Sequence, residues 1–272
     1  MKKIILSLVI IGGITTSCII VKANDGEDGS RNYSYNDNSI ARYSETKTFN
    51  VQNFSGVKVS QGIRVEIVKS DTEKAVATSN YMEYLRVENK GGVLTIYYET
   101  PKGNNNIRNA DTKVIVYAKE VNNLRASSAG NIVVKDRFSA ASLDVDISSA
   151  GRVQYDAKVG KLKLRLSSAA TFSGNIDVQS LDADMSSAST VNVQGRAGSV
   201  VVETSSAATF NGADLTSDAV TADASSGSKI KIEVTKELNA GASSGASVRY
   251  KAPSGGIKQS VRKSSGGSVT TM

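Results

Sequence analysis

Apolar and polar residues alternate along most of the chain beyond residue 47. A period of two is typical of strands with one buried face, whereas an amphipathic helix has a period of 3.6. One inward-facing series, for example, consists of Leu143, Val145 and Ile147. The pattern predicts an all-β protein built from short strands.

A tetrad of two serines and two small residues recurs eight times, at intervals of 18 to 21 residues. The tetrads begin at Ser127, Ser148, Ser167, Ser186, Ser205, Ser225, Ser243 and Ser264. A short, nearly constant period is the signature of a stacked coil. We therefore expect a single-stranded parallel β-helix (β-solenoid) with about 19–20 residues per coil and right-handed crossovers.

Two columns of residues after the tetrads are expected to fill the interior. Five residues beyond the first serine the repeats place Ile132, Val153, Phe172, Val191, Phe210, Ile230, Val248 and Val269, and two residues further on they place Val134, Tyr155, Gly174, Val193, Gly212, Ile232, Tyr250 and Thr271. Glycine follows each phenylalanine, so large and small side chains compensate within a narrow core. Gln259 and Lys263, where earlier repeats bury aliphatics, mark the last coil.

The serine pairs could be nucleophiles or glycan attachment points. Tight corners also require small residues, and stacked hydroxyls can bond to the backbone and to one another. A nucleophilic serine needs a general base, and the chain contains no histidine. A serine–lysine pair stays open, but nothing singles one out, so we predict structural corners and no catalytic residues.

The amino terminus has the layout of a secretory signal. Lys2 and Lys3 precede an apolar run over residues 4–14, which is too short to span a bilayer as a permanent helix. The following Thr-Thr-Ser-Cys resembles the cleavage site of a bacterial lipoprotein, with Cys18 as the lipidated first residue of the mature chain. The alternative is a stray cysteine in an ordinary signal or an uncleaved anchor.

These features divide the chain into four parts: a lipoprotein signal peptide (1–17), the lipidated cysteine with a disordered tether (18–46), an amino-terminal β portion (47–122) and the repeat solenoid with its cap (123–272). The tether is rich in Asn, Asp, Gly and Ser and cannot bury enough apolar surface to fold. Acyl chains on Cys18 would hold the protein to a membrane. Asp25, Glu27 and Asp28 resemble an outer-surface export cue of some Gram-negative lipoproteins.

The composition argues against disulfides, transition-metal centres and nucleic-acid binding. With one cysteine and no histidine, the chain lacks a disulfide partner and the commonest transition-metal ligand, so we predict no cofactor and no metal centre of that kind. The formal charge of +7 falls to +5 once Lys2 and Lys3 are removed. No block of basic residues is interleaved with aromatics, so we do not expect nucleic-acid binding.

Residues 47–122 also look like strands, although they lack the tetrads. Short alternating or buried runs cover 54–59, 62–67, 85–88, 93–98 and 113–117, separated by turn-rich breaks. Whether they stack as coils or form a separate small sheet is left open.

The chain resembles the family described as "putative auto-transporter adhesin head GIN domain". The resemblance lies in residues 54–67, the strand at 92–96, and the segment 124–130 that opens the repeats, and it covers about residues 47 to 252. It implies a β-helical body and a role in adhesion or polysaccharide binding. It brings no catalytic motif.

The outward-facing column two residues before each tetrad is the place to look for a binding surface. It reads Arg125, Asp146, Arg165, Asp184, Glu203, Asp223, Gly241 and Arg262. Asp184, Glu203 and Asp223 are three acids in succession, which repel one another unless something positive lies beside them. This candidate ladder could take Ca²⁺ or a basic group of a partner, or it is a solvated stripe relieved by nearby lysines.

We therefore expect a non-enzymatic, lipid-anchored protein of the cell envelope, on either face of the outer membrane, that binds a glycan or a surface protein. The alternatives are a polysaccharide lyase or hydrolase, since parallel β-helices host such enzymes, and a passive envelope scaffold. Tyrosines such as Tyr81, Tyr84, Tyr97 and Tyr98 could stack on sugars, and at least one of the last two faces outward. Exposed solenoid ends could pair, so a homodimer is open.

Overall fold

The structure is a computed structural model, and it describes residues 43–101 and 107–272. The predicted signal peptide, Cys18 and nearly all of the predicted tether lie outside these ranges. The described chain is all β, with nineteen strands in one continuous sheet. Over the same ranges, no helix is long and apolar enough to cross a membrane.

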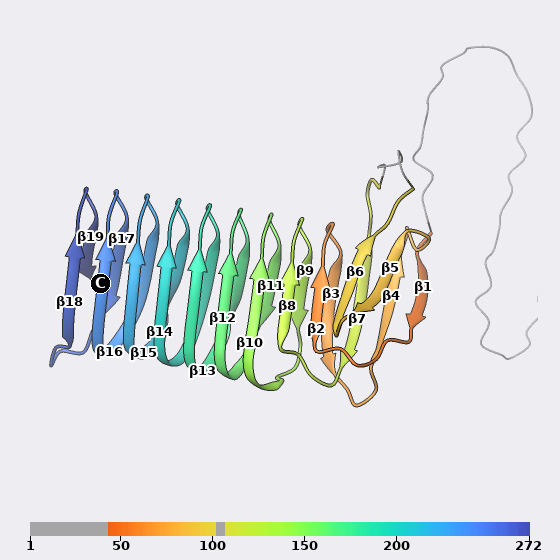
Figure 1. Cartoon of the computed structure of the whole chain (residues 1–272), viewed down its shortest axis with the longest axis horizontal. Helices are drawn as coiled ribbons and strands as arrows, with labels where there is room; N and C mark the ends of the chain where they lie inside the picture. The colour runs from red at the N-terminus through yellow and green to blue at the C-terminus, as the bar shows by residue number, and fades with distance from the viewer. Residues whose placement is uncertain (1–42, 102–106) are drawn as a thin grey trace, which may run out of the picture. The chain divides into compact units, whose positions relative to one another are not determined.

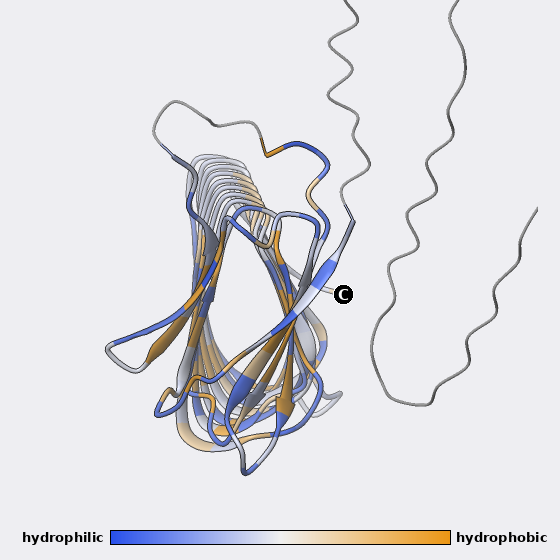
Figure 2. Cartoon of the chain, turned by 90° about the vertical axis from the view of Figure 1, so that its right-hand side faces the viewer, coloured by the Kyte–Doolittle hydropathy of each residue, from blue (hydrophilic) through white to orange (hydrophobic). Residues whose placement is uncertain are grey.

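The repeats form a parallel β-solenoid, as the period predicts (Figure 1). Its strands are β8 (Asn123–Ala126), β9 (Asn131–Val134), β10 (Ser139–Ile147), β11 (Arg152–Tyr155), β12 (Lys158–Leu166), β13 (Thr171–Met185), β14 (Thr190–Thr204), β15 (Thr209–Ala224), β16 (Lys229–Ala242), β17 (Ser247–Lys251), β18 (Lys258–Lys263) and β19 (Ser268–Thr271). Viewed along the stack, strands before and after the tetrads form two facing layers (Figure 2). We call these the leading sheet and the trailing sheet.

Each tetrad is a tight turn in an unusual backbone conformation. Its second and third residues both have positive φ, for example 55° at Ser168 and 60° at Ala169. The amide of the fourth residue donates to the carbonyl of the first, as Ala170 N does to Ser167 O over 3.3 Å. Two left-handed residues closed by this bond are the geometry of a type I′ turn, which usually recruits Asn-Gly. Here serine and alanine adopt it, at a cost of roughly 1–2 kcal/mol per residue.

Hydrogen bonds between neighbouring corners accompany this strain. The third residue of each corner donates its amide to the second serine's carbonyl on the next corner: Ala150 N reaches Ser168 O, and Ala169 N reaches Ser187 O, both over 2.9 Å. The same bond joins every successive pair of tetrads, the last being Gly245 N to Ser265 O. Gly62, in an equivalent corner before the first tetrad, donates in the same way to Ser128 O. The ladder of backbone hydrogen bonds therefore continues through the turns, where water would otherwise compete for these groups.

The interior columns lie where the alternation predicts. Phe172 and Phe210 are fully buried, and Tyr155 and Tyr250 are 1% and 8% exposed. Phe210 confirms the large-against-small compensation, because a Cβ on Gly212 would lie 2.7 Å from its ring. Gly174 is small for another reason: its Cβ would lie 1.9 Å from the carbonyl oxygen of Tyr155 on the preceding coil.

The amino-terminal part both stacks and forms a cap. β2 (Gly56–Val59) and β3 (Arg64–Lys69) make a coil that pairs in parallel with β8 and β9, and β6 (Val93–Tyr98) and β7 (Thr112–Ala118) make another on its outer side. β4 (Lys74–Ser79) and β5 (Leu85–Lys90) then pair antiparallel with β7 and β6, and β1 (Glu45–Phe49) pairs antiparallel with β4. The last two residues assigned to the tether, Glu45 and Thr46, therefore belong to β1.

A buried hydroxyl chain ties this cap together. Thr112 Oγ1 lies 2.5 Å from both Tyr98 OH and Ser79 Oγ, joining β7 to β6 and β4. Burial raises the pKa of the Tyr98 hydroxyl. At the other end, Gln259 and Lys263 on β18 are exposed, as expected for the last coil.

The corner geometry predicts a reversal of the usual effect of glycine. Ala169 is exposed with φ at 60°, so Ala169→Gly should relieve strain and raise the free energy of unfolding by about 0.5–1 kcal/mol. Ala183, buried inside β13, is the matched control, and Ala183→Gly should lower stability by about 1 kcal/mol. Thermal melts of both variants compare the two effects; equal losses would show that the corners are unstrained.

Candidate functional site

The predicted outward column exists and runs along the leading sheet. Strand pairing places Asp146 opposite Arg125 and Arg165, and Asp184 opposite Arg165 and Glu203. The register continues from Glu203 through Asp223 and Gly241 to Arg262, and in the other direction from Arg125 to Lys58 of β2. These side chains therefore share one outward face, one strand spacing apart.

At the amino-terminal end of this column, charges of opposite sign alternate. Asp146 lies between two guanidinium groups, 2.7 Å from Arg165 Nε and 3.6 Å from Arg125 Nε. The hydrogen bond that Arg165 Nε donates to the Asp146 carboxylate raises the pKa of Arg165. All three side chains are partly exposed, so each pair contributes at most about 1 kcal/mol. Asp184, the other neighbour of Arg165 in this column, forms no ion pair in the described part of the chain.

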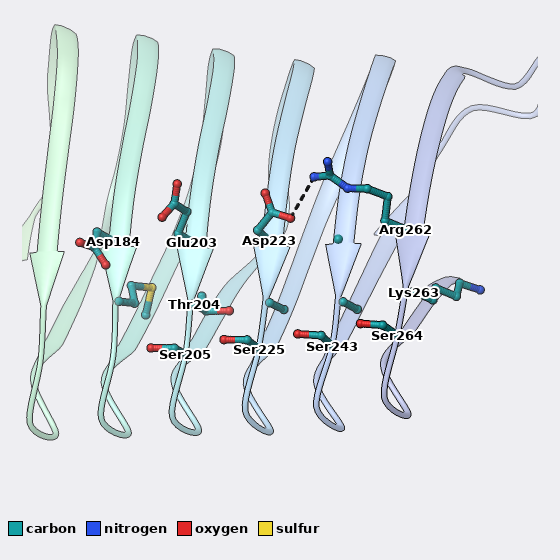
Figure 3. Close-up of a pocket in the computed structure, with 14 residues that line it drawn as sticks. Asp184, Glu203, Thr204, Ser205, Asp223, Ser225, Ser243, Arg262, Lys263 and Ser264 are labelled. Carbon is teal, nitrogen blue, oxygen red and sulfur yellow. Dashed lines mark hydrogen bonds and ion pairs between the residues drawn. The ribbon is translucent and has the colours of Figure 1, made fainter.

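The three acids of the candidate ladder are not equivalent. Arg262 Nη2 reaches across the intervening strand to Asp223 Oδ1, 3.4 Å away (Figure 3). Gly241 permits this contact, because a Cβ there would lie 2.0 Å from the same carboxylate oxygen. Asp184 and Glu203 remain as neighbouring carboxylates with no cationic partner among the described residues.

A shallow groove follows this column beside the tetrads. It consists of two hollows of about 470 and 430 Å³ that share Asp184 in their walls. The first serines of successive tetrads form one of its sides, and the hydroxyls of Ser205, Ser225, Ser243 and Ser264 lie in a row (Figure 3). The groove therefore presents hydroxyls and carboxylates at a regular spacing.

The serine hydroxyls do not perform the structural task expected of them. Within the described ranges no hydroxyl of the first or second serine of a tetrad forms a hydrogen bond, because the turns are closed by backbone groups. Among the tetrad serines of these ranges, only those at the fourth position form hydrogen bonds through the hydroxyl. Ser228 Oγ donates to Thr204 O over 3.0 Å, and Ser189 Oγ donates to Leu166 O over 3.4 Å. Stacked hydroxyls that bond to one another are therefore not what holds the corners.

Nowhere in the described ranges do three acidic or cysteine side chains surround a position that could hold a metal ion. The carboxylates of Asp184 and Glu203 project from the same side of one sheet (Figure 3). Whether this pair takes a cation or a basic group stays a prediction, and a calorimetric titration with calcium tests it.

The tyrosines differ in exposure: Tyr43 is 92% exposed and Tyr84 is half-buried. Tyr98 and Tyr81 are buried, and Tyr97 is half-buried, with its hydroxyl donating to Glu88 and the ammonium of Lys90 over its ring. The prediction that one of Tyr97 and Tyr98 faces outward is met by Tyr97.

A third hollow, of about 290 Å³, lies on the trailing sheet, and the sequence analysis does not predict it. Amide side chains line it, including Gln154, Asn192 and Asn211 in one column. In three repeats the residue six positions beyond the first serine is an amide, namely Gln154, Asn192 and Asn211. Such amides look like ordinary surface residues until the columns are aligned.

Two solved structures from Parabacteroides species share this fold. A protein from Parabacteroides distasonis titled "putative lipid binding protein" is 19% identical, with a TM-score of 0.76 over 85% of this chain and 97% of that one. A "putative adhesin" from Parabacteroides merdae is 20% identical, with a TM-score of 0.73 over 85% and 96%. At this identity the likeness shows the fold alone.

The family model described as "Putative auto-transporter adhesin, head GIN domain" matches residues 53–253. The chain belongs to this family. The match confirms the resemblance carried by residues 54–67 and 124–130, and it extends over both the amino-terminal coils and the tetrads. No curated protein matches the sequence of this GIN-domain protein.

The family sequence around Ser60 has a clear structural role. Ser60, Gln61, Gly62 and Ile63 form another corner, with φ values of 58° and 71° at the two central residues. The Ile63 amide donates to Ser60 O over 3.4 Å, and Gly62 bonds to the first tetrad. The opening motif is thus the first coil's version of the tetrad, hidden because it shares only one serine with the others.

Proposed function

We propose that this GIN-domain protein is a lipid-anchored component of the cell envelope whose solenoid is a non-enzymatic binding surface for a polysaccharide or a surface protein. The observation that carries the proposal is the column geometry. Outward side chains recur at one strand spacing, roughly 4.8 Å, over many coils, and the hydrogen-bonded corners hold them in register. Such a surface suits an extended ligand better than a compact one.

The site chemistry favours binding over catalysis. A glycosidase places two carboxyl groups on either side of the scissile bond, whereas Asp184 and Glu203 are neighbours on one face of one sheet. The serine hydroxyls in the groove have no histidine to activate them. No observation favours the lyase or hydrolase alternative.

The location rests on the amino-terminal sequence. Cys18 follows a short apolar run and precedes a polar tether, which supports attachment of the solenoid to the outer membrane by acyl chains. A homodimer through the β18 edge is disfavoured, because Lys258, Arg262 and Lys263 would meet their own copies there. The partner we expect is therefore a ligand along the sheets.

Binding without turnover is the expected behaviour of the purified mature domain. A glycan array should show retention of polysaccharides, and assays for reducing ends and unsaturated products should show no release from the same glycans. Turnover would replace the proposal with the enzymatic alternative. Absence of both would leave a protein ligand, tested by cross-linking on whole cells, or a passive scaffold if no cross-linked partner forms.

Removal of the lipid attachment point tests the location. The wild type should incorporate a labelled fatty acid and Cys18→Ser should not, because the acyl chains are attached to this cysteine. Ser30→Ala, in the predicted tether, is the matched control and should be labelled like the wild type. Equal labelling of Cys18→Ser and the wild type, or no labelling of either, would contradict lipid anchoring at Cys18, and protection of the wild type from protease on intact cells would contradict a role in adhesion.

A further inference from the structure

The trailing sheet carries a patch of polar, uncharged side chains across three consecutive coils. In β13, β14 and β15 the outward positions after the tetrads are Thr171, Ser173, Asn175, Thr190, Asn192, Gln194, Thr209 and Asn211. We call this set the neutral patch. The same coils carry Asp184, Glu203 and Asp223 on the leading sheet, and the trailing strands become charged just beyond the patch, at Asp177, Arg196 and Asp214.

Strand pairing brings the neutral patch into straight columns. Thr171, Thr190 and Thr209 are successive partners, and so are Ser173, Asn192 and Asn211. Gln154 of β11 extends the second column by one coil. The patch therefore offers rows of hydroxyls and amides in the direction of the solenoid axis.

The amides of the patch are largely free to bind something else. Asn211 Nδ2 makes one long contact of 3.4 Å to Asn192 Oδ1, and the side-chain amides of Gln154 and Gln194 make no hydrogen bond among the described residues. Amides with a structural task behave differently here: Asn89 donates to two carbonyl oxygens, those of Gln52 and Asn53, and accepts from the Gly92 amide. A structural role therefore does not account for the patch amides.

The backbone beside these side chains contains two glycines and a register shift. Gly174 lies against the carbonyl of Tyr155. Gly195 has a φ of 109°, and a Cβ there would lie 2.3 Å from Ile176 O. A register shift between Asn192 and Gln194 sets Asp214, not Ala213, opposite Gln194. At both glycines a carbonyl oxygen of the preceding coil occupies the space of a side chain, so close backbone approach explains them. Together with the register shift they adjoin the hollow that Asp156 and Asp214 border.

We propose that the neutral patch binds an uncharged polysaccharide chain that lies along the solenoid axis. This inference rests on the proposed function and adds the class of the ligand and the sheet that binds it. Amides and hydroxyls donate and accept at once, as sugar hydroxyls require. The strand spacing is comparable to the length of one pyranose in an extended chain. An anionic polymer would meet Asp156 and Asp214 at the border of the hollow, although Arg152, Lys229 and Lys231 extend the patch columns on the neighbouring coils. A protein partner would find no apolar anchor.

Paired substitutions on the two sheets test the assignment. The probes are the neutral hexasaccharides cellohexaose, laminarihexaose and maltohexaose, with oligogalacturonate as the anionic comparison. For the neutral probe that binds best, Asn192→Ala with Asn211→Ala should weaken binding at least tenfold, measured by calorimetry. Asp184→Asn with Glu203→Gln should leave it within twofold. All four positions are outward, so thermal melts should show both variants folded.

The outcomes separate this inference from the proposed function. Binding of a neutral glycan that is lost in the leading-sheet variant, or binding of oligogalacturonate alone, would overturn the neutral patch while leaving a glycan-binding protein. No binding of any glycan, on the array as well as in these titrations, would overturn the patch together with the polysaccharide branch of the function.

Discussion

The hydrogen bond between successive corners is the interaction on which the rest of this structure depends. Each corner holds two residues in the left-handed region, and in five of the tetrads neither is glycine. Such a turn is unfavourable by itself. It persists because the amide of its third residue and the carbonyl of its second serve the neighbouring coils, so that each corner is stabilised by the corners on both sides.

Because the corners are locked in this way, equivalent positions of all coils fall into columns. Inward columns give the core of Phe172, Phe210, Tyr155 and their smaller neighbours. Outward columns give the leading sheet its paired and unpaired charges and the trailing sheet its neutral patch. One backbone device thus determines both the packing and the two surfaces, and the function is set by which side chains occupy the outward columns.

The sequence predicts the repeated part well because its signals are local. Alternation, tetrad spacing and the size relation between Phe210 and Gly212 are each visible within one or two coils. The prediction failed where a contact joins distant residues. The Arg262–Asp223 pair depends on the absence of a side chain at Gly241, and the reason for Gly174 is a backbone carbonyl one coil away. The amino-terminal coils could not be ordered from sequence, because β6 and β7 stack outside β2 and β3 although they follow them in the chain.

The central claim is that like positions of consecutive coils lie one strand spacing apart, and disulfide trapping measures this directly. In a Cys18→Ser background, Asp184→Cys with Glu203→Cys places two thiols on neighbouring coils, at a Cα separation of roughly 4.8 Å, inside the range of about 4.4–6.8 Å that a disulfide spans. Asp184→Cys with Asp223→Cys doubles the separation. If the coils are stacked in register, the first pair should oxidise rapidly within one molecule and the second pair should not. Equal oxidation of both pairs, or of the second alone, would contradict the stacked coil.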